Sequence, residues 1–270
     1  MRLPVSGQEV RFRAPDGNDD LAILEAAGSA LEQALAVIPL LARLPESNCR
    51  KRGAESKPAP WEAMTVTDLE AALLGLRRFL FGDTVICLYR DPSHPCEVRM
   101  EVEFSITALL DEVKPRMPHG VRTVKAAPSW YGFETATARG LEFRLPTAAD
   151  QLESMSDARG AGALAERCVK GAKGATQISA RAEKAMEAMS PAVSQSLEGS
   201  CPECGKPVSI PLYVPQLVMN ELRDGARGVY GEIDLIAGSY HWEEAVILAL
   251  PRSRRKAYAE AIRNRMRSGE

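Results

Sequence analysis

The chain has 270 residues, with 34 Lys and Arg against 36 Asp and Glu and a formal net charge of −2. This length allows one or two domains with a core that needs no disulfide. The nearly balanced charge argues against nucleic-acid binding driven by the overall charge of the protein. No apolar run approaches the roughly 18 residues that span a bilayer, and residues 1–10 lack a basic-then-apolar secretion signal. We therefore expect a globular protein of cytoplasmic location, free or attached to a larger particle.

Two short segments of the chain are similar to each other. Residues 10–21 and 141–152 share Phe, Arg, Pro, Asp and Leu at the same spacing. In each, a strand-like stretch ends at the proline, and a polar turn leads into an apolar helical pattern. The spacing predicts a helix N-cap at Asp16 or Asn18 in the first segment and at Thr147 in the second.

Apolar residues at helical spacing mark the other helices of the chain. They are expected over residues 21–44, 68–79, 161–168, 180–189 and, with breaks near Gly238 and Pro251, 218–267. Thr65 or Thr67 is positioned to cap the second of these helices.

A second pair of similar segments begins at cysteines. After Cys96 and after Cys204, apolar and polar residues alternate strictly, which predicts a half-buried antiparallel strand leading into a helix. Because both pairs occur in the same order, the sequence favours an α+β fold made of two diverged copies of one unit. Each copy combines helices, short antiparallel strands and a zinc-knuckle-like turn. We expect a first unit over residues 1–113, a Pro-rich linker over 114–129, and a second unit over 130–270 that ends in helices.

The Cys-Pro-Glu-Cys-Gly segment from Cys201 to Gly205 is the sharpest local motif. Such a turn brings the sulfurs of Cys201 and Cys204 to one point, about 2.3 Å from a tetrahedral zinc. A structural zinc needs four ligands. Cys168 is the candidate third ligand, and the fourth stays open between His241, an acidic side chain and none. A turn that has lost its metal is the alternative interpretation.

The corresponding turn of the first unit contains Cys87, Asp91, His94 and Cys96, all of residue types that can ligate zinc. Its spacing departs from the Cys-Pro-x-Cys-Gly pattern, since prolines follow Asp91 and precede Cys96. The sequence therefore favours a turn that no longer binds metal over a working site.

Basic and aromatic side chains are concentrated in the last 31 residues of the chain. Residues 252–270 hold seven basic and two acidic side chains, a net charge of +5. A short basic helix without interleaved aromatic side chains favours an acidic protein partner over nucleic acid. The expected partner-binding residues are Tyr240, Trp242, Arg252, Arg254, Arg255 and Tyr258.

Taken in order, these motifs resemble the baseplate hub assembly chaperone family of T-even-type tailed phages, also found in prophages and contractile injection clusters. The resemblance covers residues 10–262 and rests on the segments that begin at Thr67, Arg144, Cys201 and Tyr240 and on the segment that ends at Cys168. It implies a non-enzymatic assembly factor that binds baseplate, hub or spike subunits of a tail-like particle. The first cysteine turn departs from the family pattern, because Asp91 stands where the family often has cysteine.

A zinc-ribbon-like regulator that binds nucleic acid is the competing hypothesis. It predicts a steeply salt-dependent affinity for DNA or RNA. The sequence contains no GxSxG, no GxxxxGK[ST] and no GxGxxG after a strand, so no motif marks an enzyme. The residues alone therefore lead to a protein-binding module with a candidate zinc turn.

Overall fold

The computed structural model describes residues 1–45, 61–90, 96, 99–125, 127–134, 141–157, 159, 161–171 and 176–268. The helices are α1 (Gly17–Glu25), α2 (Ala30–Leu41), α3 (Val66–Phe81), α4 (Ile106–Glu112), α5 (Ala148–Met155), α6 (Ala161–Cys168), α7 (Thr176–Met189), α8 (Val214–Ala226), α9 (Val229–Tyr240), α10 (Glu244–Leu248) and α11 (Arg252–Ser268), with a 3-10 turn at Trp61–Ala63. The strands are β1 (Arg11–Phe12), β2 (Ala42–Arg43), β3 (Thr84–Arg90), β4 (Arg99–Ser105), β5 (Val121–Val124), β6 (Ala127–Phe133), β7 (Glu142–Phe143), β8 (Val169–Lys170), β9 (Ser196–Ser200) and β10 (Pro207–Pro211). This mixture of helices and small antiparallel sheets confirms the predicted α+β class.

Two stretches of the chain repeat one order of elements. We call residues 11–112 the first unit and residues 142–226 the second unit. Each contains a short strand, two helices, a strand that pairs antiparallel with the first, a helix, a β-hairpin and a final helix. This shared order favours the hypothesis of two diverged copies.

The same arginine–aspartate pair fixes the first helix of each unit. The Arg13 guanidinium donates to both carboxylate oxygens of Asp19 at 2.6 and 2.7 Å, and Arg144 binds Asp150 in the same two-pronged way. Each aspartate also accepts the backbone N–H of its helix N-cap, which closes a capping box. The similarity between residues 10–21 and 141–152 therefore encodes one helix-start motif. The predicted caps Asp16, Thr65 and Thr147 are confirmed.

Replacing Asp150 by asparagine should lower the free energy of unfolding by roughly 1–3 kcal/mol at pH 7. Burial raises the pKa of Asp150, but hydrogen bonds from Arg144 and Thr147 lower it further, to about 2. In the unfolded chain the pKa of an aspartate is about 3.9. The stabilisation by ionised Asp150 is therefore complete above this pH and is lost as the pH falls towards 2. Urea unfolding at several pH values should show the gap between wild type and Asp150→Asn closing on acidification. A gap independent of pH would contradict this assignment, and Asp111→Asn at an exposed position is the control.

The main hydrophobic core joins the two units. It lies among α1, α2, α3 and α4 of the first unit, and α8 from the end of the second unit packs against the first three of these helices. Val218, Met219 and Leu222 of α8 are fully buried there. The division at 114–129 therefore does not separate two independent cores.

The predicted linker also contains regular structure. Residues 121–124 form β5 and residue 127 begins β6, and these strands extend the sheet of the second unit in the order β5-β6-β7-β8. Phe133, Phe143 and the inner face of α7 form a separate core behind this sheet. Prolines and basic residues in this segment were the basis for the linker, and among its described residues 114–120 and 125 lie outside helices and strands.

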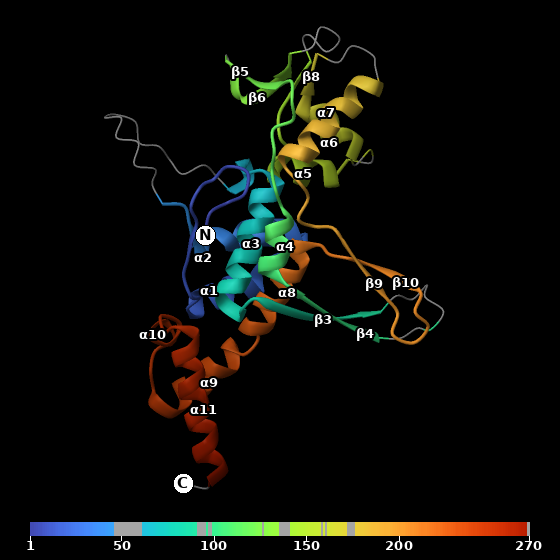
Figure 1. Ribbon diagram of the computed structural model, residues 1–270. Coiled ribbons are helices and arrows are strands. Elements are labelled where there is room, and N and C mark those ends of the chain that lie inside the picture. Colours follow the sequence, from blue (N-terminus) through green and yellow to red (C-terminus); the bar gives the residue numbers. More distant parts are fainter. Residues whose placement is uncertain are drawn as a thin grey trace, which may run out of the picture.

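The C-terminal helices α9, α10 and α11 form a third body with its own small core. Figure 1 shows it below the first unit, with the sheet of the second unit at the opposite end. The break predicted near Gly238 lies at His241, which ends α9 in the left-handed conformation. No helix among the residues given above is both long and apolar enough to cross a membrane.

Candidate metal centre

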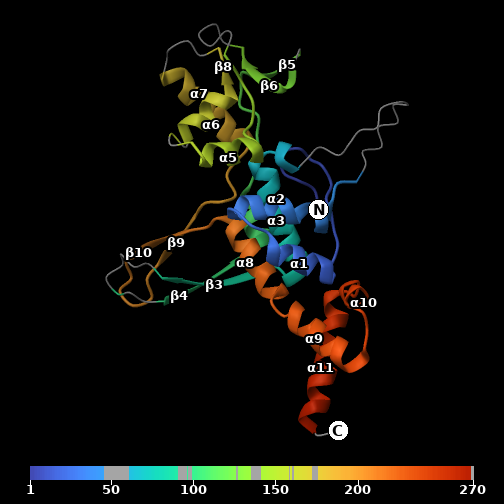
Figure 2. The same ribbon diagram turned by 180° about the vertical axis from the view of Figure 1, so that it is seen from behind.

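Two β-hairpins leave the body side by side. We call β3–β4 the first hairpin and β9–β10 the second hairpin, and both views show them projecting together from the same side (Figures 1 and 2). Their inner faces pack on one another near the tips, where Met100 and Val208 are buried. The alternation after each cysteine in the sequence therefore marks the shared inner face.

Three cysteines meet at the hairpin tips. The sulfurs of Cys96, Cys201 and Cys204 all lie within 4.8 Å of one another. In a tetrahedral site with Zn–S bonds of about 2.3 Å, sulfurs stand about 3.8 Å apart, so the group is close to the size of a metal site. Cys96 belongs to the first hairpin and the other two to the second. One ion would thus tie the two units together.

The second turn is built to present its sulfurs. The Cys201 N–H donates to the Lys206 carbonyl at 2.8 Å, and the Gly205 N–H donates to the Cys201 carbonyl at 2.9 Å. Gly205 has a φ of 68°, in the left-handed region that favours glycine. A side chain at this position would strain the turn that holds Cys201 and Cys204.

The electrostatics of the turn favour a bound cation. Backbone N–H groups of Cys204 and Glu203 donate to the Cys201 sulfur and lower the pKa of its thiol. The hydrogen bond with Cys204, together with burial and neighbouring negative charge, raises the pKa of Cys96. Three thiolates this close repel one another, and a divalent cation compensates that repulsion. The donor set therefore fits a thiophilic metal ion.

Cys168, the predicted third ligand, lies elsewhere. It ends α6 and is buried in the core behind the sheet of the second unit. Its carbonyl accepts the N–H of Arg144 at 2.9 Å, as the Leu41 carbonyl accepts that of Arg13 in the first unit. Cys168 thus occupies the place of a core leucine, and burial raises the pKa of its thiol to about 11. Cys96, and not Cys168, is the third cysteine of the group with Cys201 and Cys204.

The other ligand candidates divide between distant and undescribed positions. His241 is exposed at the end of α9, and α9 lies away from the hairpins (Figure 1). Cys87 lies within β3, outside the three-cysteine group. Asp91 and His94 fall outside the described residues.

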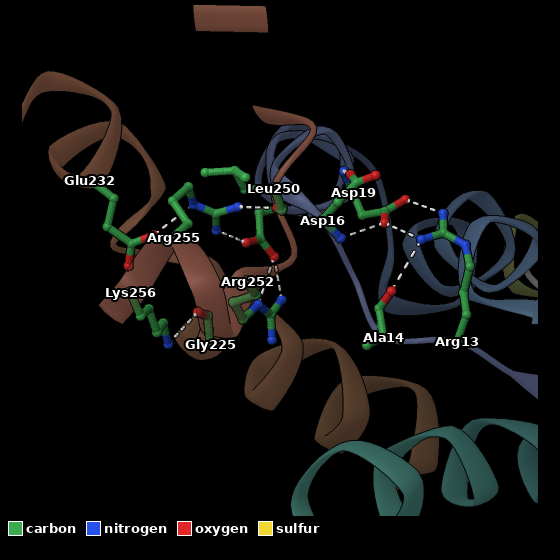
Figure 3. A network of polar contacts seen from close by, with 11 residues as sticks. Arg13, Ala14, Asp16, Asp19, Gly225, Glu232, Leu250, Arg252, Arg255 and Lys256 are labelled. Carbon is green, nitrogen blue, oxygen red and sulfur yellow. Dashed lines mark hydrogen bonds and ion pairs between the residues drawn. The ribbon is translucent and has the colours of Figure 1, made fainter. Parts of the chain in front are cut away.

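Two of the predicted partner-binding arginines instead make internal ion pairs. Arg255 is 1% exposed and binds Asp20 and Glu232, the latter at 2.7 Å. Arg252 binds the other oxygen of Asp20 and is largely covered. Figure 3 shows this network between the start of α11 and the first unit. Two guanidinium groups balance two carboxylates, so the network is neutral and fixes the C-terminal body in place.

Glycine allows the close approach that this network needs. A Cβ atom on Gly17 would lie 2.7 Å from the Leu248 Cα and 2.8 Å from the Arg255 Nη1. The Arg252 N–H also donates to the Pro15 carbonyl at 3.1 Å. The corresponding contact of the second unit runs from the Val66 N–H to the Pro146 carbonyl at 3.2 Å. Each helix-start motif therefore receives the first turn of another helix.

The remaining predicted partner-binding residues stay near the surface. Tyr240, Trp242 and Tyr258 form a half-buried aromatic cluster with ring centroids 5.3–5.9 Å apart. Arg254 is exposed beside Arg255 on α11. These four residues remain candidates for a partner surface.

Sequence reasoning considered Cys96 as a ligand but favoured a turn without metal, and it missed Asp20 as an ion-pair partner. Cys96 precedes Met100 by the same number of residues by which Cys204 precedes Val208. This spacing places both cysteines at hairpin tips and was a usable signal. Asp20 carried no such signal, because in the sequence an acidic pair beside a helix start is sufficiently explained by capping.

No family model, curated protein or solved structure matches the chain.

Proposed function

We propose that the chain is a non-enzymatic assembly factor that acts by protein–protein binding and carries a structural zinc ion. Its partners on this proposal are baseplate, hub or spike subunits of a tail-like particle. The proposal rests on the cysteine cluster for its structural part and on the family resemblance for its partners.

The observation that carries the structural part is the shared cysteine cluster. Sulfur-rich ligand sets are typical of closed, structural zinc sites, whereas catalytic zinc keeps an open position and is commonly held by histidine and carboxylate. The cysteines come from two projecting hairpins, so an ion bound to all three would cross-link the hairpins. Such a cross-link would keep the hairpin surfaces rigid for binding.

Zinc is the metal that this donor set suits best, because it accepts tetrahedral thiolate coordination without redox chemistry. On this proposal the three cysteines Cys96, Cys201 and Cys204 are the protein ligands of the zinc ion.

Buried charges elsewhere are committed to internal contacts. Asp68 accepts the N–H groups of Val5 and Ser6 at 2.8 and 2.9 Å. Glu70 accepts both the N–H and the hydroxyl of Ser194, and burial raises the pKa of Glu70. These carboxylates brace the fold.

The test is isolation of the tagged full-length chain from its native cell, with identification of bound proteins by mass spectrometry. We expect baseplate, hub or spike subunits in the eluate. Arg254→Glu should lower their recovery several-fold, because an exposed charge at an interface steers association. The same charge reversal at exposed Lys184 on α7 should leave recovery unchanged. Nucleic acid held with a steep salt dependence, without structural proteins, would contradict the proposal and favour the regulator hypothesis.

A further inference from the structure

The outer face of the first hairpin carries exposed apolar side chains. Ile86 and Leu88 alternate on β3 and point away from the packed inner face, with exposed fractions of 57% and 70%. They lie directly opposite Glu103 and Glu101 on β4. Cross-strand neighbours share one face with their Cβ atoms about 5 Å apart. The face therefore combines two apolar side chains with two carboxylates.

The second hairpin provides an internal comparison. Its outer face carries Ser196, Glu198 and Ser200 opposite Pro211, Ser209 and Pro207. The Ser209 hydroxyl donates to Glu198 on this face at 2.8 Å. A hairpin in this position is thus compatible with a polar outer face. The fold does not require exposed Ile86 and Leu88, which points to a binding surface.

The end of α11 presents a complementary surface. Arg263, Met266 and Arg267 lie on one side of the helix, since residues three and four apart are neighbours there. Met266 is 65% exposed, and both arginines are exposed. Arg265 is turned away from this side and stacks on Tyr240 at 5.4 Å. In the part of the chain that the structure describes, neither Arg263 nor Arg267 has an ion-pair partner.

The spacings of the opposite charges match. Glu101 and Glu103 are two residues apart on a strand, a separation of about 7 Å. Arg263 and Arg267 are four residues apart on a helix, a rise of about 6 Å. Met266 lies between the arginines and can face Ile86 and Leu88. Arg90 and Arg99 stand at the far end of the hairpin face, so the helix end must lie over the glutamates nearer the body.

We propose that the outer face of the first hairpin binds the C-terminal end of α11 from a second copy of the chain. The hairpins and the end of α11 extend from the body in different directions (Figures 1 and 2). Within one chain, the end of α11 therefore does not cover the outer face of the first hairpin. In a two-fold dimer each copy gives its helix end and receives the other, which makes two identical contacts. This inference is independent of the assembly role proposed above.

The test is a charge exchange between the two surfaces, measured by sedimentation of the full chain over a concentration series. The wild type should form dimers that weaken with salt. The double variant Glu101→Lys, Glu103→Lys and the double variant Arg263→Glu, Arg267→Glu should each raise the dissociation constant by about tenfold or more. An equimolar mixture of the two variants should dimerise again, because each faces opposite charge on the other. Glu198→Lys on the second hairpin and Arg254→Glu are the matched controls and should leave dimerisation unchanged.

Two results would overturn the proposal. One is a wild-type monomer at every concentration and salt, which would leave the face to a partner of basic amphipathic chemistry. The other is self-association that persists in both double variants, which would place the interface elsewhere. All four substituted side chains are exposed, and circular dichroism of each variant checks that the fold is retained.

Discussion

Replacing Arg255 by alanine should lower the free energy of unfolding by about 3–5 kcal/mol. The substitution removes one cation from a buried network and leaves Asp20, which is 0% exposed, and Glu232, which is 4% exposed, with less compensation. Uncompensated buried carboxylates are costly because the interior does not replace their hydration. Denaturant unfolding followed by far-UV circular dichroism measures the change.

Arg254→Ala is the matched control, because it is the same change one residue earlier on the exposed side of α11. It should alter the free energy of unfolding by less than about 0.5 kcal/mol. Asp20→Ala should resemble Arg255→Ala, and the double variant should cost less than the sum of the two. Equal, small effects of Arg254→Ala and Arg255→Ala would contradict the buried network.

On the proposed zinc centre, a chelator should release the hairpin tips and leave the main core intact. An isolated two-stranded hairpin is marginally stable in water, so we expect the contact between the inner faces at Met100 and Val208 to weaken when the cysteine cluster holds no metal ion. Hydrogen exchange of the amides in β4 and β10 should accelerate by about tenfold or more. The amides of α3, whose apolar side faces the main core, should be unaffected.

Cys201→Ser should reproduce the effect of the chelator without any chelator present. Cys168→Ser is the control, because Cys168 lies in another core and should affect only local stability. Unchanged exchange in β4 and β10 after metal removal would mean that side-chain packing alone holds the hairpins together.

The sequence was sufficient for the local elements. Leucines at helical spacing predicted α3, and strict alternation predicted strands where β4 and β10 lie. The caps Asp16, Thr65 and Thr147 followed from residue type and position. These features depend on neighbours within a few residues, which a single sequence contains in full.

The sequence was not sufficient for contacts between units. The amphipathic pattern of α8 shows that one face is buried but not which core receives it, and α8 packs on the first unit. The basic start of α11 was interpreted as a surface for partners, whereas Arg252 and Arg255 bind Asp20 some 230 residues earlier in the chain. Charge alone does not distinguish a solvated arginine from one that meets a distant buried carboxylate.

The cysteines considered as metal ligands include both a local feature, which the sequence predicted, and a contact between units, which it did not. Cys201 and Cys204 are close in sequence and their turn was predicted correctly as a unit. Cys168 was chosen as the third ligand by its closeness in the chain, although a lone cysteine is commonly a small buried hydrophobe. Cys96 was identifiable only from the repeat, because equivalent hairpins packed face to face bring equivalent tip residues together.

The measurement that tests the shared metal centre most directly is zinc content with X-ray absorption at the zinc edge, on wild type, Cys96→Ser and Cys168→Ser. The account predicts about one zinc per chain with three sulfur ligands in the wild type, loss of one sulfur and of affinity in Cys96→Ser, and no change in Cys168→Ser. Full zinc content with an unchanged sulfur shell in Cys96→Ser, or loss of zinc in Cys168→Ser, would contradict a centre shared between the two hairpins.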